Sequence, residues 1–145
     1  MSRHRILLAW SAAFVSALAF AAGASAQSDK PQGTVYRSPG GSTLRLILDD
    51  TNIGAEISVG ELTFLPNTDS GDHAHGAIEI LYVLSGELEH VVNGKSMILK
   101  PGMAGYVKPP DKIRHKTGPA GAKVLVMWVP GAEANRIVSR WTKEP

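Results

Sequence analysis

The chain has 145 residues, with 15 basic residues, 13 acidic residues and no cysteine. Its length predicts one domain, its nearly balanced charge excludes the basic footprint of a nucleic-acid-binding protein, and the lack of cysteine excludes disulfides. An apolar core must therefore stabilise the fold.

The first 26 residues have the three-part pattern of a secretory signal peptide. Arg3 and Arg5 form a basic start, an apolar run covers residues 6–22, and the small residues 24–26 match an A-x-A cleavage site. The apolar run is near the lower limit for crossing a bilayer, so an uncleaved membrane anchor is the alternative. The small residues and the polar segment 27–30 favour cleavage, which predicts an exported protein, periplasmic or secreted, with no stable membrane anchor. Loss of Arg3 and Arg5 leaves 13 of the 15 basic residues against 13 acidic residues, so the mature chain is formally neutral.

After the signal peptide, short apolar strands alternate with turns. A polar lead-in covers residues 27–42 and contains a first candidate strand at 34–37. Further strands are expected at 43–48, 56–64, around the histidines at 73 and 75, and at 80–84, 87–92, 96–99, 106–107 and 123–129. Nine or ten short strands with almost no helical periodicity predict an all-β fold, an antiparallel sandwich or barrel over residues 43–130. Residues 131–145 are expected to form a tail that packs on the barrel as a short helix or an irregular segment.

Four side chains form the strongest candidate site. On a strand, His73 and His75 point to the same face because side chains alternate with period two, and Glu79 has the same parity. His115 lies beyond two further turns. Three imidazoles and a carboxylate suit one divalent transition metal, whether Mn, Fe, Ni, Cu, Co or Zn, with further positions open to water or substrate. The alternative is a pair of exposed histidines beside a solvated glutamate, but an inward carboxylate without a cation would be costly.

These residues resemble the cupin family, whose first motif is G-x5-H-x-H-x3,4-E-x6-G. His73, His75, Glu79 and Gly86 keep every spacing of this motif, and Asn67 stands in place of the leading glycine. The second motif, G-x5-P-x-G-x2-H-x3-N, is partial. It is represented by Pro110 and His115 at the right spacing, with Lys112 and Pro119 in place of its glycine and asparagine.

The resemblance covers residues 43–130. It implies a double-stranded β-helix, also called a jelly-roll barrel, with a metal inside one end. It also implies His73, His75, Glu79 and His115 as the metal ligands. Cupins include dioxygenases, decarboxylases, isomerases, lyases and non-enzymatic binding proteins, so the resemblance alone does not select a function.

Two functions are compatible with this pattern. The first is a metal-dependent enzyme that acts on a small oxygenated organic molecule by dioxygenation, decarboxylation or isomerisation. The second is a non-catalytic module that binds a metal or a small ligand after export. Inward-facing His90, Tyr106 or Arg45 near the open metal position would favour the enzyme, and we take His90 and Tyr106 as the candidate catalytic residues. Base rates nevertheless favour His90 as a partly buried strand residue, and alternation favours Arg45 as a solvent-facing one.

An open barrel also has strand edges to protect, so we hypothesise a homodimer. We expect no nucleic-acid partner and a small molecule as ligand or substrate.

Overall fold

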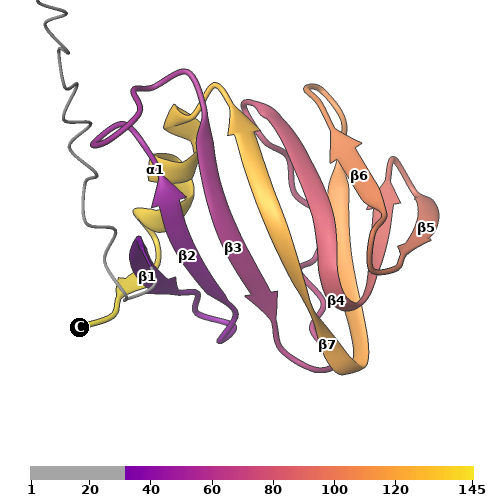
Figure 1. Ribbon diagram of the computed structural model, residues 1–145. Coiled ribbons are helices and arrows are strands. Elements are labelled where there is room, and N and C mark those ends of the chain that lie inside the picture. The colour runs from indigo at the N-terminus through magenta and orange to yellow at the C-terminus, as the bar shows by residue number, and fades with distance from the viewer. Residues whose placement is uncertain (1–31) are drawn as a thin grey trace, which may run out of the picture.

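Strands built from alternating apolar residues form one curved antiparallel sheet with a single short helix beside it (Figure 1). The computed structural model describes residues 32–145, so the predicted signal peptide lies outside the described residues. The elements are β1 (Thr34–Arg37), β2 (Thr43–Leu48), β3 (Ser58–Phe64), β4 (Ile78–Val92), β5 (Lys95–Leu99), β6 (Ala104–Val107), β7 (Ile113–Val129), α1 (Ala132–Val138) and β8 (Thr142–Lys143). The all-β class and the short C-terminal helix are confirmed. Within residues 32–145, no helix is long and apolar enough to cross a membrane.

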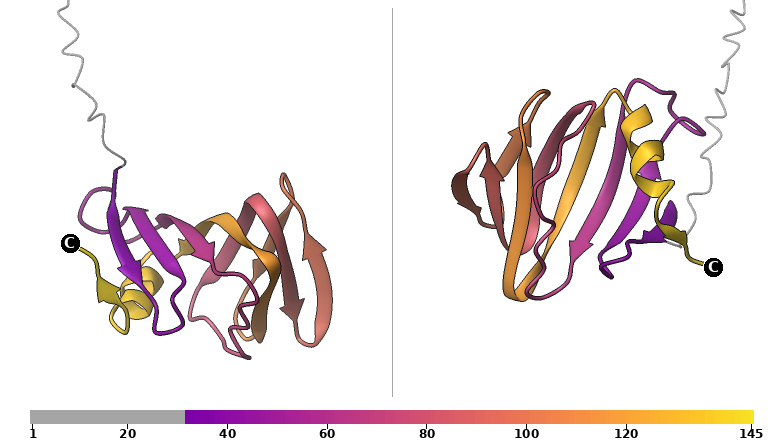
Figure 2. Two further views of the ribbon diagram at one scale, coloured as in Figure 1. Left: turned by 90° about the horizontal axis from the view of Figure 1, so that it is seen from below. Right: turned by 180° about the vertical axis from the view of Figure 1, so that it is seen from behind.

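The strand order is β5-β4-β7-β3-β2-β1-β8, and β6 pairs with the first half of β4. Strands β4 and β7 are the long central pair, and both curl with the sheet (Figures 1 and 2). The break expected between the predicted strands at 80–84 and 87–92 does not exist, because both belong to one continuous strand, β4. The ladder to β7 persists through register shifts on either side of Gly86, which has a positive φ of 72° and lies too close to Gly121 for a side chain. A bulge of this kind bends a strand without ending it.

The prediction of a strand around His73 and His75 is also wrong. His73 makes one isolated bridge, exchanging backbone hydrogen bonds of 2.8–2.9 Å with Ile113, and the rest of the segment is irregular. Gly71, with a positive φ of 64°, bends the chain on one side of the histidines, and a bend at Gly76 leads into β4 on the other side. Apart from the isolated bridge at His73, the segment makes no strand pairing with the sheet.

The inward face of the sheet forms the core. Its buried side chains include Leu44, Leu46, Leu62, Phe64, Leu81, Val83, Leu88, Leu99, Val124, Val126 and Trp128. Helix α1 lies beside β2 and β3 on the side that carries the core (Figure 2), where Ala134 is buried and Ile137 and Trp141 pack against it. The C-terminal tail thus closes part of the open side of the sheet.

Candidate functional site

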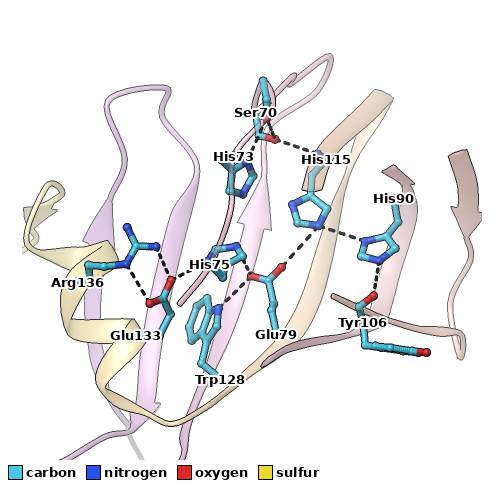
Figure 3. A network of polar contacts seen from close by, with 11 residues as sticks. Ser70, His73, His75, Glu79, His90, Tyr106, His115, Trp128, Glu133 and Arg136 are labelled. Atoms are coloured by element: carbon cyan, nitrogen blue, oxygen red, sulfur yellow. Dashed lines mark hydrogen bonds and ion pairs between the residues drawn. The ribbon is translucent and has the colours of Figure 1, made fainter. Parts of the chain in front are cut away.

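The four predicted ligands converge at one end of the core (Figure 3). The rings of His73 and His75 have centroids 5.0 Å apart, and those of His73 and His115 are 5.9 Å apart. Glu79 lies between two of the imidazoles, with Oε1 3.3 Å from His75 Nε2 and Oε2 3.8 Å from His115 Nε2. All four side chains line a cavity of about 530 Å³.

Glu79 is an inward carboxylate with an incomplete set of partners. It is 3% exposed. The Trp128 indole Nε1–H donates to Oε1 over 3.0 Å, whereas Oε2 has no hydrogen-bond partner. Burial raises the pKa of Glu79 to about 8, although the indole hydrogen bond opposes this rise. A cation beside Oε2 would remove the cost of ionising this group.

His75 is oriented by the C-terminal helix. Its Nδ1 lies 2.9 Å from Oε1 of Glu133, which Arg136 holds through Nε at 2.9 Å and through Nη2. Because a carboxylate accepts, His75 Nδ1–H is the donor, and the lone pair of His75 Nε2 faces the site. That nitrogen is buried without a hydrogen bond, and burial lowers the pKa of His75. A metal-binding histidine commonly has such a carboxylate behind it.

The sequence analysis did not identify Glu133 and Arg136 as residues of the site. Glu133 is 6% exposed although it follows the last long strand in a tail that carries no motif. Its only signal is the i, i+3 spacing from Arg136, which places the two on one face if the tail is helical. That signal does not reveal that the pair docks on His75.

His115 is held differently, through His90 on the neighbouring strand. His90 Nε2 lies 3.2 Å from the Tyr106 carbonyl, which can only accept, so His90 Nδ1 is left as the acceptor. His115 Nε2, 3.2 Å from His90 Nδ1, is then the donor in this arrangement. Burial is the largest cause that lowers the pKa of both imidazoles, and it favours the neutral form of each. For His115 to bind a metal through Nε2, its proton must move to Nδ1 and the bond to His90 must open.

As the side chains stand, no group of three or more His, Asp or Glu side chains in residues 32–145 is arranged to hold an ion. The donor set nevertheless fits a transition metal. His73 Nδ1 is bonded to the Gly71 carbonyl over 3.0 Å, which leaves its Nε2 free. Two of the four side chains, His75 and Glu79, carry buried atoms without hydrogen bonds. One change of tautomer at His115 would complete a set of three imidazole nitrogens and one carboxylate.

Of the two candidate catalytic residues, the structure brings one toward the cluster. His90 is 4% exposed and reaches the site through His115, without lining the cavity. Tyr106 is 66% exposed, and its ring points away from the histidines while its carbonyl bonds His90 (Figure 3). The Tyr106 hydroxyl is therefore not placed to act at the cluster. Arg45 is half-buried and faces Glu61 across the outer side of β2 and β3, also away from the cavity.

The comparisons with known proteins agree with this architecture. The family model described as "Cupin domain" matches residues 60–130. No curated protein matches the chain in sequence.

Among solved structures, the chain is similar to an RmlC-like cupin from Shewanella frigidimarina, with 21% identity over 70% of this chain and 88% of that one and a TM-score of 0.61. It is similar to KdgF from Halomonas sp., with 17% identity over 66% and 84% of the two chains and a TM-score of 0.58. It is also similar to Bacillus subtilis oxalate decarboxylase, a protein with Mn(II) centres, with 18% identity over 71% of this chain and 29% of that one and a TM-score of 0.61. At these identities the likeness shows the fold alone.

Proposed function

Because this chain contains a cupin domain over residues 60–130, we propose that it binds one divalent transition metal through His73, His75, Glu79 and His115. We further propose that it is an enzyme that uses this ion on a small oxygenated organic molecule, in a reaction of the dioxygenase, decarboxylase or isomerase type. The alternative is a non-catalytic module that binds a metal or a small ligand.

One observation carries the metal proposal: two unpartnered buried atoms lie on neighbouring predicted ligands. His75 Nε2 and Glu79 Oε2 are both buried without hydrogen bonds. A buried polar group without a partner costs about 1–3 kcal/mol, and more for a charged group. A divalent cation would accept both lone pairs and offset both costs at once. Glu79 would then be ionised, since the ion supplies the positive charge that the apolar surroundings lack.

The remaining residues of the site would hold these ligands in place. Trp128 would fix the Glu79 carboxylate through Oε1, and Glu133 would fix the His75 ring through Nδ1. Apolar side chains of the cavity wall, among them Leu62 and Phe64, would limit access of water. A bound divalent ion with an open position would supply Lewis-acid chemistry toward a substrate oxygen or, if redox-active, chemistry with dioxygen.

The choice between enzyme and binding module depends on a proton-transfer group. His90 touches the cluster only through His115, so we assign it as a positioning residue that controls the His115 tautomer. The enzyme reading is supported by the size of the cavity, which falls within the roughly 300–1,000 Å³ of small-molecule sites, and by its polar side chains. The binding-module reading is favoured by the outward direction of the Tyr106 ring.

Elemental analysis of the purified protein tests the proposal. We expect close to one equivalent of a single transition metal in the wild type and a near-complete loss in His75→Ala. Asp72→Ala is the matched control, since Asp72 is an exposed carboxylate three residues away on the same segment, and it should keep the metal. A wild type without metal after reconstitution with each of the six candidate ions would contradict the proposal. Oxygen-uptake assays with a redox-active ion, or turnover assays of small oxo and hydroxy acids with Zn or Ni, then distinguish enzyme from binding module.

A further inference from the structure

The cavity lining includes two arginines from the C-terminal segment. Arg136 projects from α1, and Arg140 follows the helix by two residues. Both line the same cavity as His73, His75, Glu79 and His115. This segment lies outside residues 60–130, the span that the cupin family model matches.

The charges around the cavity do not balance. The aspartate in its lining, Asp69, is neutralised by Arg114, which donates to it from Nε at 2.7 Å and from Nη2 at 2.5 Å. Arg136 is balanced by Glu133. Arg140 has no hydrogen bond or ion pair from its side chain to any described residue. A divalent ion at the cluster would exceed the single charge of Glu79 and add to this excess. The cavity would therefore carry a net positive charge in the metal-bound protein.

Arg136 also keeps free donors. It binds Glu133 through Nε and Nη2, and its Nη1 makes no hydrogen bond among the described residues. The carboxylate thus fixes the guanidinium in one orientation. A fixed guanidinium loses little conformational freedom when a ligand binds, and guanidinium–carboxylate hydrogen bonds are among the stronger ones in proteins.

Apart from the arginines and the histidines, the cavity lining is mainly apolar with a few hydroxyl groups. Ile137 and Trp141 line it beside the arginines, and Phe64 lies 5.6 Å, centroid to centroid, from the ring of His115. Ser38 and Ser42 add hydroxyl groups to the lining. Such a lining suits a molecule that carries polar groups on an apolar body.

We propose that the cavity binds a small organic acid. Its carboxylate is bound by Arg140 and by Nη1 of Arg136, its apolar body lies against Trp141 and Ile137, and an oxo or hydroxyl oxygen at its other end faces the histidine cluster. The role of the oxo or hydroxyl oxygen rests on the proposed function, because that oxygen would face the proposed metal. The carboxylate subsite does not, because Arg136 and Arg140 are not metal ligands.

An NMR titration tests this assignment with 4-oxopentanoate and its neutral analogue 4-oxopentanamide as probes. In ¹H–¹⁵N spectra of the zinc-loaded and metal-free protein, the indole signal of Trp141 reports the carboxylate subsite and that of Trp128 reports the metal site. We expect the acid to shift the Trp141 signal and to bind at least about tenfold more tightly than the amide. Arg140→Ala should remove this preference and leave the affinity for the amide unchanged, and Arg140→Lys should restore part of it.

Lys143→Ala is the matched control, because Lys143 is an exposed cation of β8 outside the cavity lining, and it should leave the affinity for the acid within about twofold. Equal binding of acid and amide, or an unchanged affinity for the acid in Arg140→Ala, would overturn the carboxylate subsite. If the wild type and Arg140→Ala both bind zinc but the wild type does not prefer the acid to the amide, the carboxylate subsite is contradicted and the metal proposal stands. If no zinc binds but the Arg140-dependent preference persists in the metal-free protein, the metal proposal fails and the subsite stands.

Discussion

Strands β4 and β7 place two polar pairs on the inward face of the sheet, and the two pairs are held in opposite ways. Glu79 pairs with Trp128 at one end of the ladder, and His90 pairs with His115 toward the other. The curl of the sheet brings Glu79 Oε2 within 3.8 Å of His115 Nε2, so both pairs border one site. In the first pair, one carboxylate oxygen has no partner. In the second pair, each imidazole bonds the other, and the Tyr106 carbonyl completes the set.

If the proposed metal binds, the two pairs would respond in opposite ways. The Glu79 pair would gain the partner that Oε2 lacks. The His90–His115 pair would lose a hydrogen bond, worth about 0.5–1.5 kcal/mol net. The affinity of the site should therefore depend strongly on Glu79, and His90 should slightly weaken it.

The largest expected effect is on metal affinity in Glu79→Gln. The amide oxygen still accepts from Trp128, but the anionic ligand is lost, so we expect the affinity to fall by at least about 1,000-fold, near 4 kcal/mol. His90→Gln on the other pair should change affinity by less than about fivefold. Competition with a chromogenic chelator measures both variants. Equal losses in the two variants would break the proposed difference between the pairs.

The next effect concerns the apolar stretch between the polar pairs. Leu81 is fully buried and lies opposite Val126. Leu81→Ala should lower the free energy of unfolding by about 2–5 kcal/mol, because it removes apolar contacts and leaves a cavity. Its metal stoichiometry should match the wild type, since no polar partner is removed. Denaturant unfolding and elemental analysis of the same preparation provide the two measurements, and a folded variant without metal would argue against this separation of roles.

A smaller effect is expected behind His75. Glu133→Gln keeps the shape of the side chain but removes the charge that orients the His75 tautomer. Substitutions behind a metal ligand commonly cost about 10–100-fold in affinity, and we expect a loss in that range with little change in unfolding by denaturant. Asn135→Ala, on the same helix and bonded to Asp50 at the surface, is the control. An unchanged affinity in Glu133→Gln would show that the helix only packs on the barrel.

The smallest effect is a pH dependence of the metal-free protein. Burial raises the pKa of Glu79 from its ordinary value near 4.5 to about 8 in the folded state, so the folded protein binds one more proton than the unfolded chain between these values. Its stability should therefore fall by about 1–2 kcal/mol as the pH rises from 6.5 to 8. The histidines contribute a pH dependence of the opposite sign below pH 6.5. The pKa values of His75, His90 and His115 are lowered in the folded state, so the unfolded chain binds more protons there. Their contribution to stability therefore falls as the pH falls.

Thermal unfolding at a series of pH values measures this dependence. Glu79→Gln should remove the fall above pH 6.5, and bound metal should remove it in the wild type because Glu79 is then ionised throughout. A wild type whose stability is flat from pH 6.5 to 8 would contradict the raised pKa of Glu79.

The sequence by itself determined the fold class and which ligand types gather at the site. Alternating apolar residues predicted the strands that became β2 and β3, because period-two side-chain placement is a property of any extended backbone. The spacing of His73, His75 and Glu79 predicted that they would come together, and they do, although the histidines lie on an irregular segment and not on a strand. The signal peptide, export and the homodimer stay predictions from the sequence.

Only the tertiary structure decided how the site is completed. The approach of His115 to Glu79 depends on the curl of β4 and β7, which no local pattern encodes, and the bulge at Gly86 reads locally as a turn. The docking of Glu133 on His75 joins residues 58 positions apart, through a helix whose packing on the core decides its orientation. Cross-strand pairing likewise decides two further features. Tyr106 lies opposite Ile80 and turns its ring outward, and His90 lies opposite His115, so the two imidazoles share a hydrogen bond. The local backbone sets which side chains alternate, whereas contacts across the interior depend on the curvature and packing of the whole sheet.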